Sequence, residues 1–428
     1  EERFHHRLVS RETTTAAFEF SLSTHPDERE RLLAESTADI LRFLQLEANY
    51  SSPLLPFLGG GFAYDYLATF EELPEVEPGA NTYPDFEFLV AQTVLAVDHL
   101  QGTAHLEGWD IDDKRLREEL DYLASLPVAA RFTAPQKERI RAVADVNDAG
   151  FRADVDKLKG NIHAGDIYQV VPARAFTVEC PNALAAYRAL RETNPSPYMF
   201  YVRGADYELF GASPESNLKF TPEDRQVQLY PIAGTRPRGL NPDGSINHEL
   251  DIRNELDMRT DQKEIAEHTM LVDLARNDLA RVAVPRSRQV AELLHVDRYS
   301  RVMHLVSRVT ATLHPDFDAL DAYRACMNMG TLTGAPKLRA TELVRRTEGK
   351  RRGSYGGAVG YLRGDGAMDN CIVIRSAYVQ DGTAVVQAGA GVVKDSVPQA
   401  EADETVHKAY AVLHAIAMAH GAELEVQR

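Results

Sequence analysis

Residues 354–393 restrict the folds open to this chain more than any other stretch. They read SYGGAVGYLRGDGAMDNCIVIRSAYVQDGTAVVQAGAGVV, in which Gly-Asp-Gly and Asp-Gly separate apolar segments. Such glycine-containing turns favour tight hairpins between antiparallel strands. Residues 93–109, TVLAVDHLQGTAHLEGW, alternate in the same way. Because strands come in runs rather than alternating singly with helices, we expect an α+β fold with large antiparallel sheets, not a doubly wound fold.

Apolar periodicity predicts helices between these strands. The expected helices cover residues 28–49, about 149–164, roughly 247–280, the histidine-containing segment SRVMHLVS (300–307) and the C-terminal residues 398–417. In the last of these, Asp395 and Ser396 can cap the helix and Pro398 suits its first turn. We expect strands at IYQVVPARAFTV (167–178), YELFGASPESNLKFT (207–221) and RQVQLYPIAG (225–234), the last two paired. Residues 128–147 have the weakest pattern and predict a surface crossing.

Charge and cysteine usage narrow the functional classes. The 428 residues include 47 basic and 64 acidic side chains, for a net charge of −17, which argues against nucleic acid or an anionic membrane as the main partner. An anionic substrate stays open, because a local cluster of arginine and metal can override the global field. No apolar run approaches the ~20 residues of a membrane span. The three cysteines are far apart in apolar contexts and predict buried thiols in a cytoplasmic protein.

The terminal helix raises the question of a cation site. Glu401 and Glu404 share one face, and Lys408 lies one turn further along. From this window alone, an acidic face exposed to solvent is the favoured interpretation, and an ion site is the alternative. Glu267, in a second acidic helix, is followed along its stripe by leucines, which disfavours a carboxylate unless a cation meets it. Either a nearby arginine or a metal ion could balance the charge of this carboxylate. Mg²⁺ requires only one or two carboxylate ligands.

Three isolated polar residues also stand in apolar surroundings. His304 lies between Met303 and Leu305, as a packed core histidine or a functional group would. Arg375 ends an apolar strand, where a side-chain anion or a substrate carboxylate would balance its charge. Glu215 follows a proline at the end of a strand and could act as a general acid. The glycine clusters at 329–337 and 387–393 do not match the spacing of nucleotide-binding loops.

Many segments, in order from about residue 56 to 417, resemble the chorismate-utilising enzymes and, within that family, the large subunits of anthranilate synthase. The segments are GDIYQVVPAR, NPSPYMFY, GASPES, PIAGTRPRG, AEHTMLVDLARNDLARV, SRVMHLVS, MGTLTGAPKLRA, RGSYGGAVGY, NCIVIRS and QAGAGVVKDS followed by EADET. The resemblance implies one large domain whose antiparallel sheets form a sandwich with flanking helices. Residues 1–147 would be its N-terminal part and 148–420 its catalytic region. Because the chain opens with Glu1, we expect it to be part of a longer product.

The family's site residues map onto this sequence one by one. The resemblance implies a single Mg²⁺ held by Glu267 and Glu404, with Glu401 close by, and this favours the ion over solvent at the terminal helix. Glu215 matches the general acid that protonates the departing C4 hydroxyl of chorismate, and His304 matches the histidine associated with pyruvate loss. The positions implied for the substrate's carboxylates and ring are Gly234, Thr235, Thr331, Tyr355, Arg375, Gly389, Gly391 and Lys408.

Two positions select the reaction within the family. Relatives that add water at C2 have a lysine base where this chain has Gln169, and relatives that attack the ring covalently have lysine where this chain has Ala233. Free ammonia needs no deprotonation, so these residues imply direct amination at C2 followed by pyruvate elimination to anthranilate, the first committed step of tryptophan biosynthesis. Two alternatives remain open: a 2-amino-2-deoxyisochorismate synthase, which stops before pyruvate loss, and a non-catalytic scaffold that binds a glutaminase.

The resemblance also implies partners. No cysteine has the glycine-flanked setting of a glutaminase nucleophile, so we expect a separate glutaminase subunit to deliver ammonia in a hetero-oligomer. In the family, L-tryptophan is a feedback inhibitor, and its matching positions here are Pro197, Tyr198, Met199, Val359 and Tyr361. The family's Leu-Glu-Ser segment is expected upstream of Glu1, although LAES at 33–36 superficially resembles it. We therefore expect the chain to bind tryptophan poorly.

Overall fold

A nine-stranded sheet forms one layer of the protein. The computed structural model describes residues 4–12, 15–21, 23, 25–47, 52, 54–109, 111–126, 139–299 and 302–428. The strands of this sheet, in spatial order, are β14 (Ile232–Pro237), β16 (Val302–Thr312), β13 (Gln226–Leu229), β12 (Ser216–Thr221), β19 (Met368–Ile372), β18 (Ala358–Arg363), β3 (Phe57–Phe62) and β4 (Phe86–Ala91), with β15 (Gln289–Arg298) paired to β16. All its described pairs are antiparallel.

A seven-stranded sheet forms the second layer. Its order is β10 (Tyr198–Arg203), β11 (Glu208–Ser213), β20 (Ser376–Gln380), β21 (Thr383–Gly389), β9 (Ala173–Glu179), β7 (Arg139–Ala144) and β22 (Glu423–Gln427). Only the β7–β22 pair of this sheet is parallel among the described residues. Three small sheets pair β1 (Leu8–Arg11) with β2 (Ala16–Phe18), β5 (Thr93–Asp98) with β6 (Thr103–Gly108), and β8 (Gln169–Val170) with β17 (Gly334–Ala335). The predicted antiparallel α+β architecture is confirmed.

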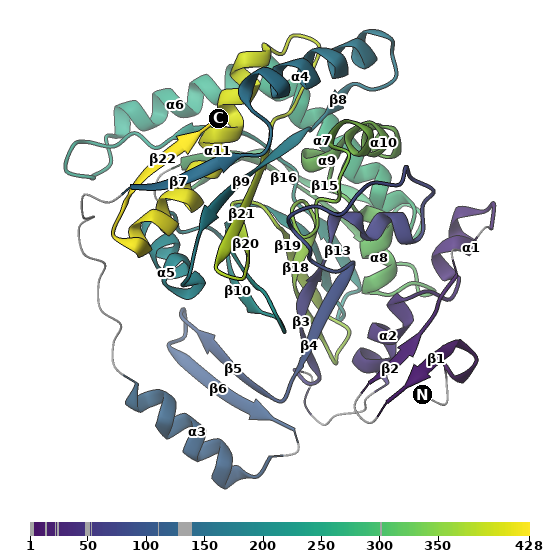
Figure 1. Cartoon of the computed structure of the whole chain (residues 1–428). Coiled ribbons are helices and arrows are strands. Elements are labelled where there is room, and N and C mark those ends of the chain that lie inside the picture. The colour runs from purple at the N-terminus through teal and green to yellow at the C-terminus, as the bar shows by residue number, and fades with distance from the viewer. Residues whose placement is uncertain are drawn as a thin grey trace.

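Helices cover the outer faces of the two sheets, except α3 (Asp113–Ser125), which lies beside the β5–β6 hairpin (Figure 1). The helices are α1 (Glu28–Leu33), α2 (Ala38–Leu46), α3 (Asp113–Ser125), α4 (Asp148–His163), α5 (Ala183–Thr193), α6 (His248–Thr260), α7 (Gln262–Ala280), α8 (Ala319–Cys326), α9 (Gly330–Thr333), α10 (Lys337–Glu348) and α11 (Pro398–His420), with short 3₁₀ turns η1 (His5–Arg7) and η2 (Tyr64–Thr69). Apolar side chains of α5 and α11 share one core with the seven-stranded sheet. Those of α2, α7 and α8 share another with the nine-stranded sheet.

The inner faces of the sheets pack against each other. Val359 and Cys371 of the nine-stranded sheet lie in one buried cluster with Leu209 and Tyr378 of the seven-stranded sheet. These positions come from alternating strand residues that point to one face, as a half-buried strand requires. The predicted sandwich with flanking helices is therefore present.

The chain passes between the two sheets at two places that lie side by side. It leaves β11 and enters β12 through Pro214 and Glu215, and it leaves β19 and enters β20 through residues 373–375. Two backbone hydrogen bonds join these crossovers: the N–H of Ile372 donates to the carbonyl of Glu215, and that of Ala212 to the carbonyl of Arg375, both at 3.0 Å. Each crossover therefore holds a polar side chain at the boundary between the layers.

Several expected helices differ from the observed ones. The predicted helix over 28–49 is two short helices, because the chain is extended at Ala34 before α2 begins. The predicted helix over 247–280 is divided at Asp261, whose side chain accepts hydrogen bonds from Lys263 N and Glu264 N and so starts α7. The apolar helix expected around His304 is wrong: β16 occupies that segment, which is rich in β-branched residues.

Two smaller expectations also need correction. The terminal helix begins as predicted with Pro398 in its first turn, but its N-cap is Val397, without a side-chain cap. Ser396 instead accepts a hydrogen bond from Val393 N at 3.0 Å. The expected surface crossing over 128–147 contains β7 from Arg139 onward, and residues 127–138 lie outside the described part of the chain. The hairpins expected at 93–109 and 354–393 are confirmed.

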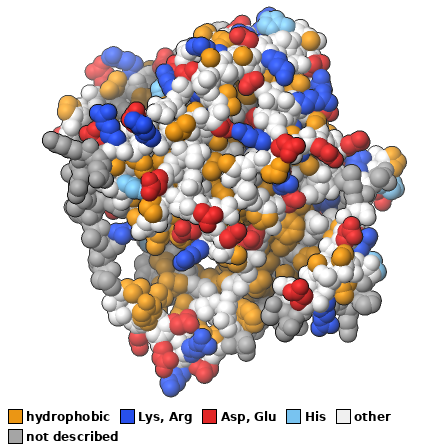
Figure 2. Space-filling view, viewed as in Figure 1, with side chains coloured by type: hydrophobic (Ala, Val, Ile, Leu, Met, Phe, Trp, Pro, Cys, Tyr) orange, Lys and Arg blue, Asp and Glu red, His pale blue; other side chains and the backbone are white. Residues whose placement is uncertain are grey.

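Within the described ranges, no helix combines the length and apolarity needed to cross a bilayer. Figure 2 shows acidic and basic side chains interspersed across the visible face, without a continuous basic area there.

Candidate active site

A cavity of about 720 Å³ lies beside the two crossovers. Its walls come from β14, β16, α7, α9, the N-terminal half of α11 and the crossover residues Pro214–Glu215 and Ile374–Arg375. Every residue predicted for catalysis, substrate contact or metal binding lines this one cavity: Gln169, Glu215, Gly234, Thr235, Glu267, His304, Thr331, Tyr355, Arg375, Gly389, Gly391, Glu401, Glu404 and Lys408. The fold thus brings together residues that lie more than half the chain length apart in sequence.

Glu215 is the buried carboxyl of this cavity. Its side chain is 8 % exposed, and its Oε1 accepts a hydrogen bond of 2.9 Å from the Thr331 hydroxyl. Burial raises the pKa of Glu215 to about 7, although the Thr331 hydrogen bond and the positive charges of Arg375 and Lys408 oppose that rise. A carboxyl group with such a pKa can hold a proton near neutral pH and donate it, which suits a general acid.

Arg375 occupies the second crossover in a strained backbone conformation. Its φ is +49°, in the left-handed region that a non-glycine residue rarely adopts, and such strain is found mostly at functional sites. Burial lowers the pKa of its guanidinium, and no carboxylate of the described residues forms an ion pair with it. The buried hydroxyl of Tyr355 lies in the same cavity, and burial raises its pKa to about 12. The pair presents a hydrogen-bonding hydroxyl and an unpaired cation, which suits a carboxylate ligand.

Arg352 and Glu348 support these residues from behind and were missed in the sequence. The Arg352 guanidinium is buried, donates to the carbonyls of Leu332 at 2.8 Å and Val171 at 2.6 Å, and lies 5.6 Å from the Tyr355 ring centroid. It forms a 2.6 Å ion pair with Glu348. Leu332, Val171 and Tyr355 all line the cavity. The ion pair holds the Arg352 guanidinium in place, and Arg352 in turn positions these three lining residues. The only sequence signal was an arginine four residues after a glutamate.

His304 faces the cavity from β16. Its Nδ1 lies 3.0 Å from the Thr235 hydroxyl of β14, and the two residues are opposite each other in the β14–β16 register. Burial, together with the nearby Arg375 charge, lowers the pKa of His304, so the ring is neutral at physiological pH and can accept a proton. Gly234 precedes Thr235 at φ +79°, and a Cβ there would lie 2.5 Å from Glu264 Oε2. Only glycine fits this position.

Gln169 lies on β8 at another wall of the cavity. It is 7 % exposed, and its side-chain oxygen is buried without a hydrogen-bond partner among the described residues. Gly391 approaches it closely, and a Cβ at that position would lie 2.9 Å from the Gln169 amide nitrogen and displace the side chain. The unpaired oxygen can accept a hydrogen bond from a small donor within the cavity.

Acidic side chains from α7 and α11 meet at the mouth of the cavity. Burial raises the pKa of Glu267, and the charges of Glu264, Glu404 and Glu401 raise it further, while Lys263 opposes the shift. Burial also raises the pKa of Glu401. Lysines pair with two of these acids: Lys263 lies 3.8 Å from Glu267, and Lys408 lies 2.5 Å from Glu404. Repulsion among these carboxylates is the electrostatic setting that a cation would relieve.

The donor set fits Mg²⁺ in its chemistry. Glu264 has one buried oxygen without a partner, beside an Oε1 that Arg236 holds at 2.5 Å. In the described part of the chain, no three or more His, Cys, Asp or Glu side chains already form a metal cage. Magnesium does not need one, because it takes one or two carboxylates and completes its octahedron with water and substrate oxygens. Glu267 and Glu404 would hold the ion, with Glu401 and Glu264 next to them.

Lys263 and His407 also line the cavity, and neither was predicted. Both had a sequence signal, since Lys263 precedes Glu267 by one helical turn and His407 follows Glu404 by three residues on α11. The sequence could not show that either side chain faces inward.

The residues predicted for a tryptophan site gather at a separate cavity of about 440 Å³. Tyr198, Met199, Val359 and Tyr361 line it, mostly from the facing strands β10 and β18. Pro197 does not, and instead lines a smaller cavity together with Arg375 and His304. The LAES segment at 33–36 lies at the end of α1 and the bend after it and does not line this cavity.

Comparisons with known proteins identify the family of the chain. The family model for chorismate binding enzymes matches residues 6–414. The chain is 53 % identical to anthranilate synthase component 1 of Salmonella typhimurium over 407 residues, covering 93 % of this chain and 78 % of that protein. It is 52 % identical to the Escherichia coli protein of the same name over 406 residues, with the same shares of 93 % and 78 %.

Solved structures give the same result for the fold. The crystal structure of anthranilate synthase component I from Streptococcus pneumoniae superposes with a TM-score of 0.78 at 32 % identity, covering 88 % of this chain and 85 % of that one. The menaquinone-specific isochorismate synthase of Escherichia coli superposes with a TM-score of 0.69 at 20 % identity, covering 89 % of this chain and 82 % of that one. At that identity the second likeness concerns the fold alone.

The buried carboxyl predicts a pH-dependent stability difference. Because Glu215 has a pKa of about 7 when folded, against 4.5 for an ordinary glutamate, the folded state holds this proton more tightly than the unfolded state. The parent protein should therefore lose stability as the pH rises from 4.5 to about 7, whereas a Glu215→Gln variant should not lose this contribution. The difference in free energy of unfolding between variant and parent should therefore shift by about 3 kcal/mol in favour of the variant between pH 4.5 and a pH above neutral. Urea unfolding at about pH 5 and pH 8 measures the difference, and identical pH dependence in both proteins would contradict the assignment.

Proposed function

Because the chain belongs to the chorismate binding enzyme family, we propose that it works as the large subunit of an anthranilate synthase. This lyase would aminate chorismate at C2 with ammonia and then release pyruvate to give anthranilate. The main support is identity of 53 % and 52 % to anthranilate synthase component 1 proteins over 93 % of the chain. The cavity supports the same choice, since Ala233 and Gln169 line it where relatives with other reactions have lysine.

The substrate would lie across the cavity with its two carboxylates apart. Arg375 and Tyr355 would hold the enolpyruvyl carboxylate. Gly234, Thr331 and Gly391 would surround the ring carboxylate near Glu267 and Glu404. When bound there, Mg²⁺ supplies Lewis-acid polarisation of that carboxylate.

The first step is a substitution around the ring. Ammonia forms the new bond at C2, and the resulting ammonium group loses one proton to solvent. Gln169 would orient the ammonia through the unpaired side-chain oxygen. The ring double bonds shift as the C4–oxygen bond breaks. Glu215 would donate its proton to that oxygen, which then leaves as water. Thr331 keeps the carboxyl group of Glu215 in place through the 2.9 Å hydrogen bond.

The second step is an elimination that makes the ring aromatic. The C2 proton is removed while the C3–oxygen bond to the enolpyruvyl group breaks, and pyruvate leaves after protonation of its enol carbon. His304 is the residue placed for this step, because burial keeps it neutral and the Thr235 hydroxyl fixes its Nδ1 side. The proposed overall reaction is chorismate plus ammonia to anthranilate, pyruvate and water.

The ammonia source is a second part of this proposal. All three cysteines are buried, and burial raises the pKa of each thiol to about 12 or higher, which disfavours a nucleophilic role in glutamine hydrolysis. A glutamine amidotransferase subunit would deliver ammonia to the cavity. A 2-amino-2-deoxyisochorismate synthase, the rival enzyme, would carry out the amination but not the elimination of pyruvate. A non-catalytic scaffold would carry out neither step.

A product assay distinguishes these readings. The chain incubated with chorismate, Mg²⁺ and a high concentration of ammonium should form anthranilate, followed by its fluorescence, and an equal amount of pyruvate. A Glu215→Gln variant should be at least about 100-fold slower, as expected for loss of a general acid. Aminated product without pyruvate would identify the rival enzyme. No product from the folded parent protein would support the scaffold reading.

Metal binding has its own readout. Free Mn²⁺, a stand-in for Mg²⁺, is measured by electron paramagnetic resonance as protein is added. We expect Glu267→Gln and Glu404→Gln each to weaken binding at least about tenfold, because a two-carboxylate site loses one ligand. Asp403→Asn is the matched control, since Asp403 is next to Glu404 on α11 but is hydrogen-bonded to Gln399 at 3.1 Å and does not line the cavity. Equal binding by all four proteins would contradict the site.

Tryptophan is proposed as a ligand of the β10–β18 cavity that this chain binds poorly. That cavity has one wall from Tyr198 and Met199 and another from Val359 and Tyr361, and Leu89 at its edge remains 48 % exposed. Calorimetry should give a dissociation constant weaker than about 1 mM, equivalent to about 4 kcal/mol. Micromolar binding would show that the described walls suffice.

A further inference from the structure

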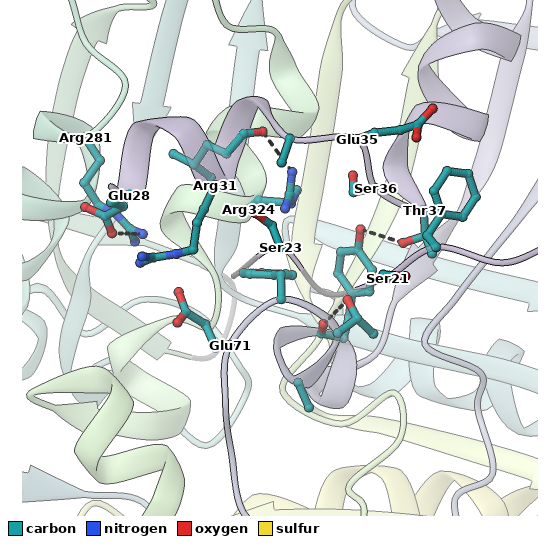
Figure 3. Close-up of a pocket in the computed structure, with 17 residues that line it drawn as sticks. Ser21, Ser23, Glu28, Arg31, Glu35, Ser36, Thr37, Glu71, Arg281 and Arg324 are labelled. Atoms are coloured by element: carbon teal, nitrogen blue, oxygen red, sulfur yellow. Dashed lines mark hydrogen bonds and ion pairs between the residues drawn. The ribbon is translucent and has the colours of Figure 1, made fainter. Parts of the chain in front are cut away.

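A second polar cavity, of about 320 Å³, lies on another part of the molecule. It is formed by α1 and the bend after it, by η2, by the C-terminal end of α7 and by α8. No residue lines both this cavity and the candidate active site. Figure 3 shows Arg31, Arg281 and Arg324 around it, together with serine and threonine hydroxyls.

Arg324 is the buried cation of this cavity. It is 4 % exposed, its Nη1 donates to the carbonyl of Leu32 at 3.0 Å, and its guanidinium lies 4.9 Å from the Phe70 ring centroid. Its Nε has no hydrogen-bond partner among the described residues. Across the described residues, no carboxylate forms an ion pair with it, and nearby Asp321 is paired with Arg42 at 2.9 Å. A buried charge without a counterion is costly, so an anion from outside would stabilise it.

Arg31 is a second cation without an acidic partner. Its Nη1 donates to the carbonyls of His25 and Pro26, both at 3.1 Å, and it forms no ion pair within the part of the chain that the structure describes. Arg281 differs, because Glu28 neutralises it. Two guanidiniums on the cavity wall are therefore free to bind an anion.

The acids on the wall offset this positive charge only in part. Glu28 is paired with Arg281, and Glu35 is engaged by Arg7 at 2.8 Å and His6 at 3.3 Å. Glu71, the remaining acid of the lining, lies near Arg31 in Figure 3 and forms no ion pair among the described residues, so one negative charge stands against the two arginines. Ser36 adds a buried hydroxyl oxygen without a partner in the described structure. The cavity thus offers cationic and hydroxyl groups in an otherwise acidic protein of net charge −17.

Part of the wall is apolar. Leu32, Tyr66 and Phe70 line the cavity, with Phe20 on another side. Planar guanidiniums bind carboxylates through parallel hydrogen bonds, and aromatic walls favour a ligand with an apolar body. An inorganic anion would leave these apolar walls uncovered.

From this combination we infer that the cavity is a binding site for a small organic carboxylate, separate from the active site. Arg31 and Arg324 bind the carboxylate, and the apolar part of the ligand packs against Phe70 and Tyr66. The site does not depend on the proposed anthranilate synthase activity, because none of its residues belongs to that cavity.

The probe is 4-fluorobenzoate, followed by ¹⁹F NMR. An Arg375→Gln background weakens carboxylate binding at the active site, so the remaining signal reports on the second cavity. We expect binding in this background, and at least tenfold weaker binding once Arg31→Gln is added. Arg29→Gln is the matched control: Arg29 lies on the same helix but interacts with Asp316 and does not line the cavity. Circular dichroism verifies folding, and Arg31 is a safe position because its described hydrogen bonds are to backbone carbonyls of the adjacent loop.

Two competitors define the ligand class. Neutral 4-fluorobenzyl alcohol should not bind measurably, and inorganic phosphate should displace the probe at least tenfold less well than benzoate does. Arg324→Lys should also weaken the probe, because the ammonium lacks the planar pair of donors. No binding in the Arg375→Gln background, or equal binding with and without Arg31→Gln, would overturn the inference. Equal displacement by phosphate, or equal binding of the alcohol, would overturn the assignment to organic carboxylates.

Discussion

The candidate active site depends on two backbone hydrogen bonds that tie one sheet crossover to the other. Ile372 N donates to Glu215 O, and Ala212 N donates to Arg375 O. Each crossover is continued by paired strands on both sides, since β11 pairs with β20 in one sheet and β12 pairs with β19 in the other. The carboxyl group of Glu215 and the guanidinium of Arg375 are therefore held at fixed places where the two layers meet.

The same crossovers create the electrostatic character of the cavity. Positions between two packed sheets are shielded from water, so burial raises the pKa of Glu215 and lowers that of Arg375. At the mouth, Glu267 and Glu404 come from two helices, and their repulsion is only partly relieved by Lys263 and Lys408. The interior thus favours a neutral acid and an unpaired cation, and the mouth favours a bound cation. A substrate with two carboxylates matches this arrangement of charges.

Local sequence patterns predicted secondary structure well where a turn sequence determines it. They predicted it less well where burial in the tertiary structure determines it. The Asp-Gly turn at 381–382 has positive φ at both residues, as its sequence indicated, and the β20–β21 hairpin follows. His304 was misplaced in a helix, because a short apolar run fits a buried strand as well as a helix. The division at Asp261 and the break after Leu33 depend on capping and packing, which periodicity alone does not show.

The sequence by itself determined the antiparallel architecture, the spacing of the acids on α7 and α11, and the residue types at Gln169 and Ala233, because turn chemistry, helical periodicity and side-chain chemistry are local properties. The resemblance of its motifs also indicated which residues belong to one site. Only the tertiary structure decided that Arg352 supports the wall behind Tyr355, that Lys263 and His407 face inward, and that Arg324 is buried with no ion pair among the described residues. These features depend on contacts between segments far apart in the chain, and burial sets both the cost of an unpaired charge and the pKa of a carboxyl group.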